Sequence, residues 1–380
     1  MNDDNGKHKK STNYFITFHQ ATDDQIIFMC IYYKEIDTLT YTAGEHIFPA
    51  ALGGIQKLSK DFVSSEFNNA ISGLELDFIR NSFVAVARQV EGPGKKGKLS
   101  DRYATKSTVS VIESAADKTI LALGYIKKGK LYEIPQVLLN TDTAKFAISF
   151  DSTAVTDIAK AIADFKGKCS EAELLKIKII DSELLPMNQI ILGIDDSVET
   201  NFNCFFAKHP SATTRLSVEK IKAIGNALQY DGTEPQRKKY MPRSTGQIKF
   251  SVDFFRIYGK IAFNFLAFLK GQEFVMATAF DQVRNWIANG GANKFAALNT
   301  ANFNPLKEMK IELPESCHHV LIYKIENRLF ATIHLYEALS VDIELDPNYT
   351  GKFSTDGFIC DWKNRKEYKL FEYISEKYVL

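Results

Sequence analysis

Residues 91–98 read EGPGKKGK, and this segment constrains the folding of the chain more strongly than any other. Glycine and proline at this density end both helices and strands. A domain boundary is therefore expected here, in a chain of 380 residues that is long enough for more than one core. Before the boundary we expect a flexible tail at 1–13 and a small module at 14–95. After it we expect a mixed α/β region at 96–246. A helical pair with antiparallel strands at 247–380 follows, either separate from that region or forming one domain with it.

The bulk composition indicates a folded protein. Hydrophobic residues make up 45% of the chain and charged residues 24%, a balance that disordered chains do not have. The formal net charge of +1 gives no overall attraction for nucleic acid, so a surface of that kind must be local. Five cysteines, odd in number and widely spaced, favour free thiols in a reducing compartment. We therefore expect a cytoplasmic protein.

Membrane insertion is not expected either. The first twelve residues are polar and lack the apolar segment of a signal peptide. The chain has no apolar run of the roughly 18 residues that a membrane span requires. Its longest apolar stretch, residues 257–269, is interrupted by Lys260 and Asn264. This stretch is typical of a buried helix, and we predict a helix over residues 252–269.

Local patterns around the module predict a hairpin followed by a helix. Residues 26–34 and 38–41 are rich in branched and aromatic side chains, which favours two strands. Apolar residues recur at helical spacing over residues 64–89. Near the C-terminus, residues 319–345 contain three further strand patterns separated by short turns. The chain is therefore predicted to be an α+β protein with a C-terminal β-meander.

Residues 45–69 bring together several residue types that catalysis uses. They are Glu45, His46, Gly53, Gly54, Asp61, Asn68 and Asn69. Phosphodiester cleavage needs a base for water and a cation held by oxygen ligands. His46 is a base that is mostly neutral at physiological pH, and Glu45 is a hard ligand suited to Mg²⁺ or Mn²⁺. Gly53 and Gly54 would let the loop between His46 and the following helix turn tightly.

The segments EHIFPAALGG and DFVSSEFNN resemble the HNH endonucleases, whose site is a β-hairpin and a helix that grip one divalent metal. The resemblance covers roughly residues 26–90 and implies an N-terminal ββα-metal module ahead of the larger mixed α/β body. On this pattern His46 resembles the general base and Glu45 the first metal ligand. Asn68 resembles the second ligand, with Asn69 as its alternative. Asp61 falls where a residue that orients the base usually lies, although a helix-capping role is equally open.

The chain departs from this pattern at the structural zinc site. Many HNH relatives carry two Cys-x-x-Cys pairs, and here the corresponding positions are Cys30 with Tyr33 and Ser64 with Phe67. One cysteine cannot build a tetrahedral zinc site. We therefore expect no structural zinc and predict that apolar packing takes its place.

A local excess of basic residues follows the module. Residues 80–130 contain eleven Lys or Arg against four acids, and clustered positive charge can contact DNA phosphates. The DNA-binding candidates are Lys95, Lys96, Lys98 and Arg102, with a solvated loop as the competing interpretation. Cys317, His318 and His319 are contiguous on a predicted strand, where neighbours face opposite ways. We interpret them as structural residues.

The leading hypothesis is a metal-dependent, HNH-like DNA endonuclease, with bacterial antiphage defence as one setting in which such modules occur. Two alternatives stay open. One is a degenerate module that only binds nucleic acid or regulates. The other is an effector gated by a ligand, in which the body is a sensor. A homo-oligomer or a regulatory partner is compatible with each hypothesis.

Overall fold

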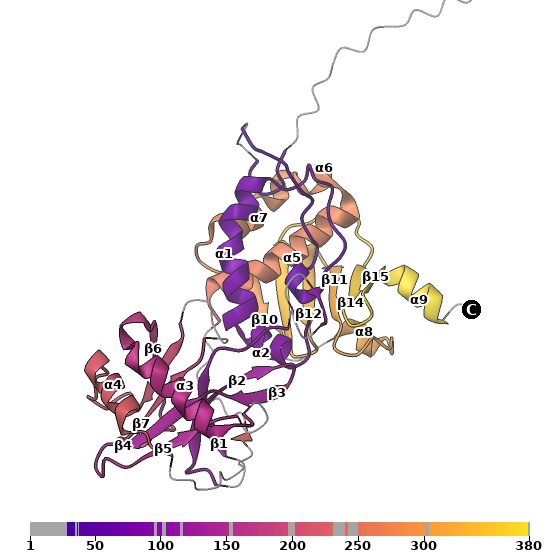
Figure 1. Cartoon of the computed structure of the whole chain (residues 1–380). Helices are drawn as coiled ribbons and strands as arrows, with labels where there is room; N and C mark the ends of the chain where they lie inside the picture. Colours follow the sequence, from indigo (N-terminus) through magenta and orange to yellow (C-terminus); the bar gives the residue numbers. More distant parts are fainter. Residues whose placement is uncertain are drawn as a thin grey trace, which may run out of the picture.

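The computed structural model confirms an α+β protein and describes residues 29–34, 36, 38–94, 97–100, 104–114, 117–151, 155–196, 202–230, 240–241, 250–300 and 304–378. Within these ranges the chain forms nine α-helices and three β-sheets. Figure 1 shows two parts. The main unit comprises the described residues of 29–100 and 250–378. The lobe comprises those of 104–241 and is inserted between two helices of the main unit. The predicted tail lies outside the described residues.

The main unit consists of helices packed on a six-stranded sheet (Figure 1). Its helices are α1 (Ser65–Asn81), α2 (Phe83–Val90), α5 (Val252–Lys270), α6 (Gln272–Val275), α7 (Asp281–Asn289), α8 (Pro305–Glu308) and α9 (Leu370–Tyr378). The sheet runs in the order β10 (Ala296–Leu298), β13 (Leu339–Asp346), β12 (Arg328–Leu335), β11 (His318–Ile325), β14 (Asp356–Asp361) and β15 (Lys366–Lys369). All its neighbouring strands are antiparallel. The predicted C-terminal meander is confirmed as β11, β12 and β13.

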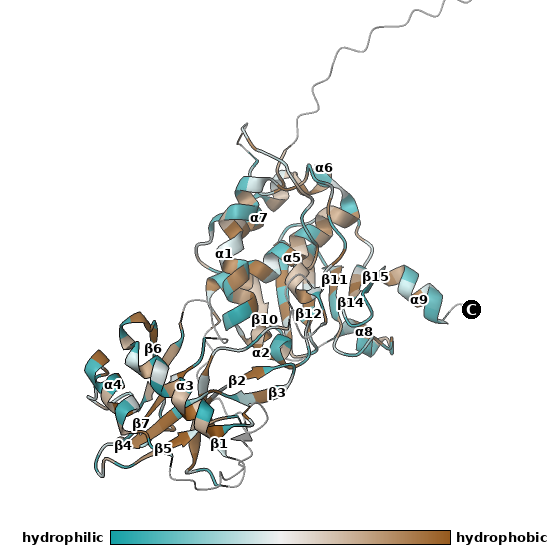
Figure 2. Ribbon diagram, viewed as in Figure 1, coloured by the Kyte–Doolittle hydropathy of each residue, from teal (hydrophilic) through white to brown (hydrophobic). Residues whose placement is uncertain are grey.

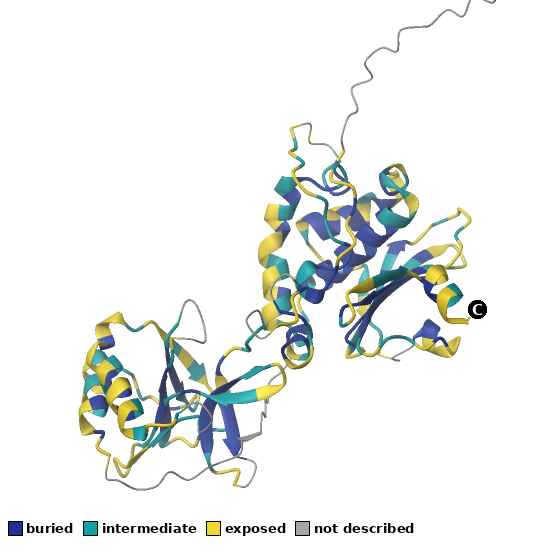
Figure 3. Cartoon of the chain, turned by 45° about the vertical axis from the view of Figure 1, so that its right-hand side comes forward, coloured by how far each residue is buried: buried dark blue, intermediate teal, exposed yellow. Residues whose placement is uncertain are grey.

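Helix α5 forms the centre of the main unit. Its residues from Phe254 to Ala267 are all buried, as Figure 3 shows by its dark colour. A helix that is apolar on every side must be covered on every side, and here α1 and the six-stranded sheet provide that cover. The prediction of a buried helix is confirmed. The hydrophobic core around α5 includes side chains from Cys30 to Val84 and from Phe254 to Trp362.

The N-terminal segment of the main unit differs from its prediction. Residues 29–34 and 38–41 contain no strand where described, so the predicted hairpin of residues 26–41 is wrong over that part, and residues 26–28 lie outside the described ranges. Ile31 and Tyr32 are buried in the core around α5. The backbone of Ile31 finds partners outside a strand, since its N–H donates to Phe62 O over 2.9 Å and its carbonyl accepts from Arg284 Nε over 2.8 Å.

The helix predicted over residues 64–89 is confirmed, but it is broken at Ser82. Ser82 has extended backbone angles, and its hydroxyl accepts the N–H of Val84. It thus caps α2 in the way that serine commonly caps helices. The break turns α2 toward the lobe, where Gly129 N–H donates to Gln89 O.

The lobe has three layers, in which a four-stranded sheet, a five-stranded sheet and a pair of helices follow one another (Figure 1). The first sheet has the order β3 (Lys130–Glu133), β2 (Leu121–Lys127), β1 (Ser110–Ser114) and β9 (Tyr240–Met241). The second has the order β5 (Phe146–Ser149), β4 (Gln136–Asn140), β7 (Gln189–Ile194), β8 (Cys204–Lys208) and β6 (Ile177–Asp181). Helices α3 (Ile158–Ser170) and α4 (Val218–Ala227) cover its outer face. The central strands of the lobe are largely hydrophobic (Figure 2), because the sheets are covered on their inner faces.

Two further predictions can be compared with the fold. All five cysteines are free thiols and all are buried, as expected. None of the helices within the described ranges is long and apolar enough to cross a membrane. The domain limits at residues 95 and 246 stay predictions, because each limit falls at residues that are not described.

Candidate active site

Glu45 and His46 lie at the start of a short antiparallel pairing. His46 bridges to Lys57, Ile47 N–H donates to Gln56 O over 3.1 Å, and Leu58 N–H donates to Glu45 O over 2.8 Å. Helix α1 begins shortly after this pairing, and Ser64 caps it by accepting the N–H of Phe67. One isolated bridge and its neighbouring hydrogen bonds thus precede α1, and no strand is formed before that helix within the described residues. The N-terminal ββα module stays a prediction.

The loop between the two paired segments is as tight as its glycine pair predicts. Gly53 has φ of +100°, and a Cβ on it would lie 2.4 Å from Trp362 Cβ. A Cβ on Gly54 would lie 1.9 Å from the carbonyl oxygen of Phe48. Such contacts exclude any larger residue unless the backbone moves. Both glycines are thus required by close packing.

Three side chains from distant segments hold the carbonyl groups of this loop. Arg88 Nε donates to Ala51 O over 2.8 Å, His318 Nε2 lies 3.0 Å from Leu52 O, and Arg365 Nη1 donates to Gly53 O over 3.1 Å. Burial lowers the pKa of His318 to about 3, although its bond to Leu52 acts in the opposite direction. His318 is therefore a neutral structural residue, as expected.

The four positions that the sequence resemblance aligns with the zinc cysteines of HNH endonucleases lie together. Ser64 N–H donates to Cys30 Sγ over 3.4 Å, and the rings of Tyr33 and Phe67 meet edge to face with centroids 5.6 Å apart. Tyr32 stacks on the same Phe67 ring at 3.8 Å. Aromatic contacts of this kind stabilise a core beyond the area that they bury. Apolar packing is thus present at these positions, and its role in place of a structural zinc stays a prediction.

The imidazole of His46 is half-buried and surrounded by charge. Burial, followed by the charge of Lys57, lowers its pKa below 6.5, while Glu45 raises it and Lys260 and Arg365 lower it further. Lys57 and Arg365 are exposed. At neutral pH His46 is consequently an uncharged base, and two of the cations that act on it face solvent.

Glu45 shares a buried ammonium with a second acid. Lys260 Nζ lies 2.6 Å from Glu45 Oε1 and 2.6 Å from Glu75 Oε1. The Lys260 side chain is 2% exposed, against 15% for Glu45 and 24% for Glu75. Burial lowers the pKa of Lys260, but Glu75 and Glu45 together more than offset this and raise its pKa above the usual value. The lysine therefore stays charged inside the protein.

One turn further along α5, Asn264 holds the backbone of the same site. Its Nδ2 donates to His46 O over 2.9 Å, and its Oδ1 accepts the hydroxyl of Tyr32 over 2.6 Å. Lys260 and Asn264 are four residues apart and so share one face of the helix. The sequence contained a signal for both, namely two polar residues at helical spacing in an apolar helix.

The remaining predicted residues do not join this cluster through any contact recorded between described residues. Asn68 is half-buried and Asn69 exposed on α1. Asp61 accepts a bond from Gln272 through its backbone and is not among the charges that shift the pKa of His46. No group of three His, Cys, Asp or Glu among the described residues is arranged to hold a metal. The roles proposed for these residues stay predictions.

Of the four predicted DNA-binding residues, only Lys98 is described, and it is exposed. Lys95, Lys96 and Arg102 lie outside the described residues. The turn that contains Lys98 packs on the loop at Gly53, because Arg365 Nη1 also lies 3.4 Å from Gly97 O. Lys98 is thus on the same side of the main unit as this loop.

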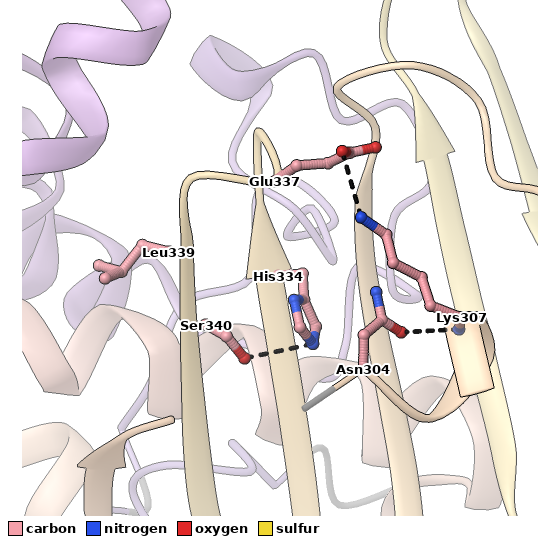
Figure 4. Close-up of a pocket in the computed structure, with 6 residues that line it drawn as sticks. All are labelled: Asn304, Lys307, His334, Glu337, Leu339 and Ser340. Carbon is pink, nitrogen blue, oxygen red and sulfur yellow. Dashed lines mark hydrogen bonds and ion pairs between the residues drawn. The ribbon is translucent and has the colours of Figure 1, made fainter. Parts of the chain in front are cut away.

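Two cavities lie away from His46. One of about 150 Å³ is on the sheet face opposite α5 and is lined by Asn304, Lys307, His334, Glu337, Leu339 and Ser340 (Figure 4). Its Lys307 and Glu337 pair with each other, and burial lowers the pKa of His334 to about 4. The other, of about 540 Å³, lies beside α3 in the lobe. Neither cavity contains the Glu45–His46 cluster.

No protein-family model, curated protein or solved structure matches this chain. The resemblance to HNH endonucleases therefore depends only on the residues quoted for it.

Proposed function

We propose that the chain is an HNH-like, metal-dependent endonuclease that hydrolyses phosphodiester bonds in DNA, with His46 as its general base. The placement of His46 carries this proposal. It lies on the first half of an antiparallel pairing that leads, through the Gly53–Gly54 loop, into α1. The meeting of Cys30 with Ser64 and of Tyr33 with Phe67 supports the same alignment.

The chemistry follows from the environment of the imidazole. An uncharged His46 can take a proton from a water molecule, which then attacks the phosphorus atom. Lys57 and Arg365, both exposed beside it, can contact phosphate oxygens. Glu45, together with Asn68 on the sequence pattern, would hold a Mg²⁺ or Mn²⁺ ion through oxygen atoms. When bound, such a cation would neutralise charge on the leaving oxygen.

One observation favours a second candidate function, a nucleic-acid-binding protein without catalysis. Glu45 is already paired with Lys260, and a carboxylate that is neutralised by an ammonium is a weaker metal ligand. In that case Lys57, Lys98 and Arg365 would bind the DNA backbone while no bond is cut. An effector gated by a ligand, in which the body is a sensor, and an antiphage setting stay predictions.

The test compares the full chain with His46→Ala on supercoiled plasmid in Mg²⁺, Mn²⁺ or EDTA. We expect nicked or linear plasmid with the unchanged chain and a divalent metal, and at least about a hundredfold slower cleavage by the variant. His209→Ala, a histidine change in the lobe, is the matched control. Equal cleavage by His46→Ala would contradict the assignment, whereas a DNA mobility shift without cleavage would favour the binding protein.

The pH dependence tests the same residue. The base works only when unprotonated, so the rate falls as pH drops through the pKa of His46. Because burial and Lys57 lower that pKa, we expect the acid limb of the rate profile below pH 6.5. Lys57→Ala removes one of the charges that lower the pKa, and the limb should then move toward higher pH. A limb above pH 7 in the unchanged chain would contradict this assignment.

A further inference from the structure

The cavity beside α8 is small, and its walls come from separate parts of the main unit (Figure 4). Asn304 and Lys307 belong to the cap and the body of α8, and the other lining residues belong to β12, β13 and the turn that joins them. The lining consists of Asn304, Lys307, His334, Glu337, Leu339 and Ser340. The volume is about 150 Å³, and a cavity of that size admits a molecule of about six non-hydrogen atoms.

Asn304 places an unpaired donor in this cavity. Its Oδ1 caps α8 by accepting the N–H groups of Leu306 and Lys307 over 3.0 and 3.4 Å. The capping fixes the amide so that Nδ2 points between His334 and the Lys307 side chain (Figure 4). Asn304 is only 6% exposed, yet Nδ2 donates to none of the residues in the described ranges and is not sealed from solvent. A buried donor needs an acceptor, and here the acceptor must come from whatever occupies the cavity.

The two charged residues of the lining hold each other only weakly. Lys307 Nζ lies 3.4 Å from Glu337 Oε2, and the two side chains are 57% and 39% exposed. An ion pair this exposed contributes little stability, so each member can exchange its partner for a charged group of a ligand. A simple anion would leave Glu337 without a cation, and a simple cation would leave Lys307 without an anion. A molecule that carries both charges leaves neither unmatched.

The remaining polar residues of the lining add no charge. His334 and Ser340 lie directly opposite each other on β12 and β13, and Ser340 Oγ lies 3.2 Å from His334 Nε2. Burial lowers the pKa of His334 to about 4, so its imidazole is uncharged at neutral pH. Together with Leu339, these side chains form a wall that suits a short uncharged group of a ligand.

We propose that this cavity binds a small zwitterion of the α-amino-acid class. The carboxylate accepts from Lys307 Nζ and Asn304 Nδ2, and the ammonium donates to the Glu337 carboxylate. In an α-amino acid both charged groups are attached to one carbon atom, so they are as close together as the charges of Lys307 and Glu337. A γ-amino acid separates them by further carbons and fits the pair less well. The site is independent of the nuclease proposal, because His46 does not line the cavity.

The experiment measures binding to the full chain by saturation-transfer difference NMR, which detects weak ligands. The probes that carry both charges on one carbon are L-alanine and L-serine. Acetate and methylammonium carry one charge each, and γ-aminobutyrate carries both at a greater separation. We expect L-alanine or L-serine to bind at least about tenfold more tightly than the other three, since a lost charge-assisted contact is worth about that much in affinity.

Two variants assign the charged groups of the ligand to their partners. Glu337→Gln should weaken the binding of L-alanine about tenfold or more, because the ammonium loses its charged acceptor. The same variant should bind acetate more tightly than the unchanged chain, because Lys307 loses a competing carboxylate. Lys307→Met should weaken L-alanine to a similar degree without any gain for acetate. A merely structural role of these residues would not separate the two probes.

The matched controls are Lys310→Met and Glu308→Gln, which remove exposed charges near α8 that do not line the cavity. Both should leave the affinity for L-alanine unchanged. The proposal is overturned if neither L-alanine nor L-serine binds the unchanged chain, or if acetate or γ-aminobutyrate binds as tightly as they do. It is also overturned if Lys307→Met and Glu337→Gln keep full affinity for them. Should one variant fail to fold, as judged by circular dichroism, the other variant and the comparison of probes decide the question.

Discussion

Buried positive charge separates the main unit from the lobe. In the main unit Arg88, Arg256, Lys260 and Arg284 are all less than 9% exposed, whereas none of the described Lys or Arg of the lobe is buried. The lobe instead packs Ile, Leu and Phe from two sheets and two helices. A buried cation costs free energy unless it is paired and hydrogen-bonded. In the main unit these residues must therefore make hydrogen bonds or ion pairs that apolar side chains cannot make.

Their partners show which bonds these are. Three of the four reach one segment, since Arg88 binds Ala51 O, Arg284 binds Ile31 O, and Lys260 binds the carboxylate of Glu45. Arg256 instead binds Ile287 O and Ala288 O. The first three targets all belong to residues 29–64, which have hardly any regular secondary structure. Buried backbone groups need hydrogen-bond partners, and long basic side chains reach into this segment to supply them. The lobe has strand ladders for the same purpose, so it needs no buried cations.

The comparison predicts that the largest loss of stability follows from truncating a buried apolar side chain of the lobe. Phe205 is fully buried on β8, and Phe205→Ala should lower the free energy of unfolding by about 4 kcal/mol through the cavity that it leaves. Thermal unfolding followed by hydrogen exchange should locate the loss in the lobe and leave the amides of α5 protected. Loss of protection in α5 to the same degree would break the comparison, because the two parts would then unfold as one.

In the main unit, the matching prediction replaces a buried charged side chain by an uncharged one of similar volume. Arg284→Met should lower the free energy of unfolding by about 3 kcal/mol, because the carbonyl groups of Ile31 and Val275 lose their donor. Urea denaturation measures the change. Arg80→Met, on the exposed surface of α1, should stay within about 0.5 kcal/mol of the unchanged chain. A stability gain for Arg284→Met would mean that apolar packing can replace the charge.

The smallest effect concerns the loop itself. Gly54→Ala places a methyl group against the carbonyl oxygen of Phe48, and relieving that clash should cost about 2 kcal/mol. Urea denaturation again gives the value. Gly73→Ala is the control, because a Cβ at Gly73 meets nothing within 4 Å, and it should be neutral or slightly stabilising on a helix. If both variants behave alike, the loop is not closely packed.

Much of this fold was readable from local patterns. The periodicity of residues 252–269 predicted α5, and the alternation in residues 319–345 predicted the meander, because both elements are stabilised by the faces that they bury. The prediction of strands at residues 26–34 and 38–41 is wrong over the described positions, because burial of apolar residues does not by itself require a strand. Among the described residues of these two segments, Cys30, Ile31 and Tyr32 are buried, but by α5 and its neighbours and not by a partner strand.

The residues of the candidate site also fall into two groups, those close together in the sequence and those brought together by packing. Glu45, His46 and the glycine pair could be singled out because they are close in sequence and of types that chemistry uses. Lys260, Glu75 and Arg365 could not, since they approach Glu45 and His46 only after α1, α5 and the β14–β15 hairpin have packed.

By itself the sequence determined which elements form around α5 and where the tight loop at Gly53 and Gly54 lies, because periodicity and backbone freedom act over a few residues. Only the tertiary structure decided which cation Glu45 meets. Lys260 lies 215 residues away from it, and a contact at that separation is selected by the packing of the whole main unit.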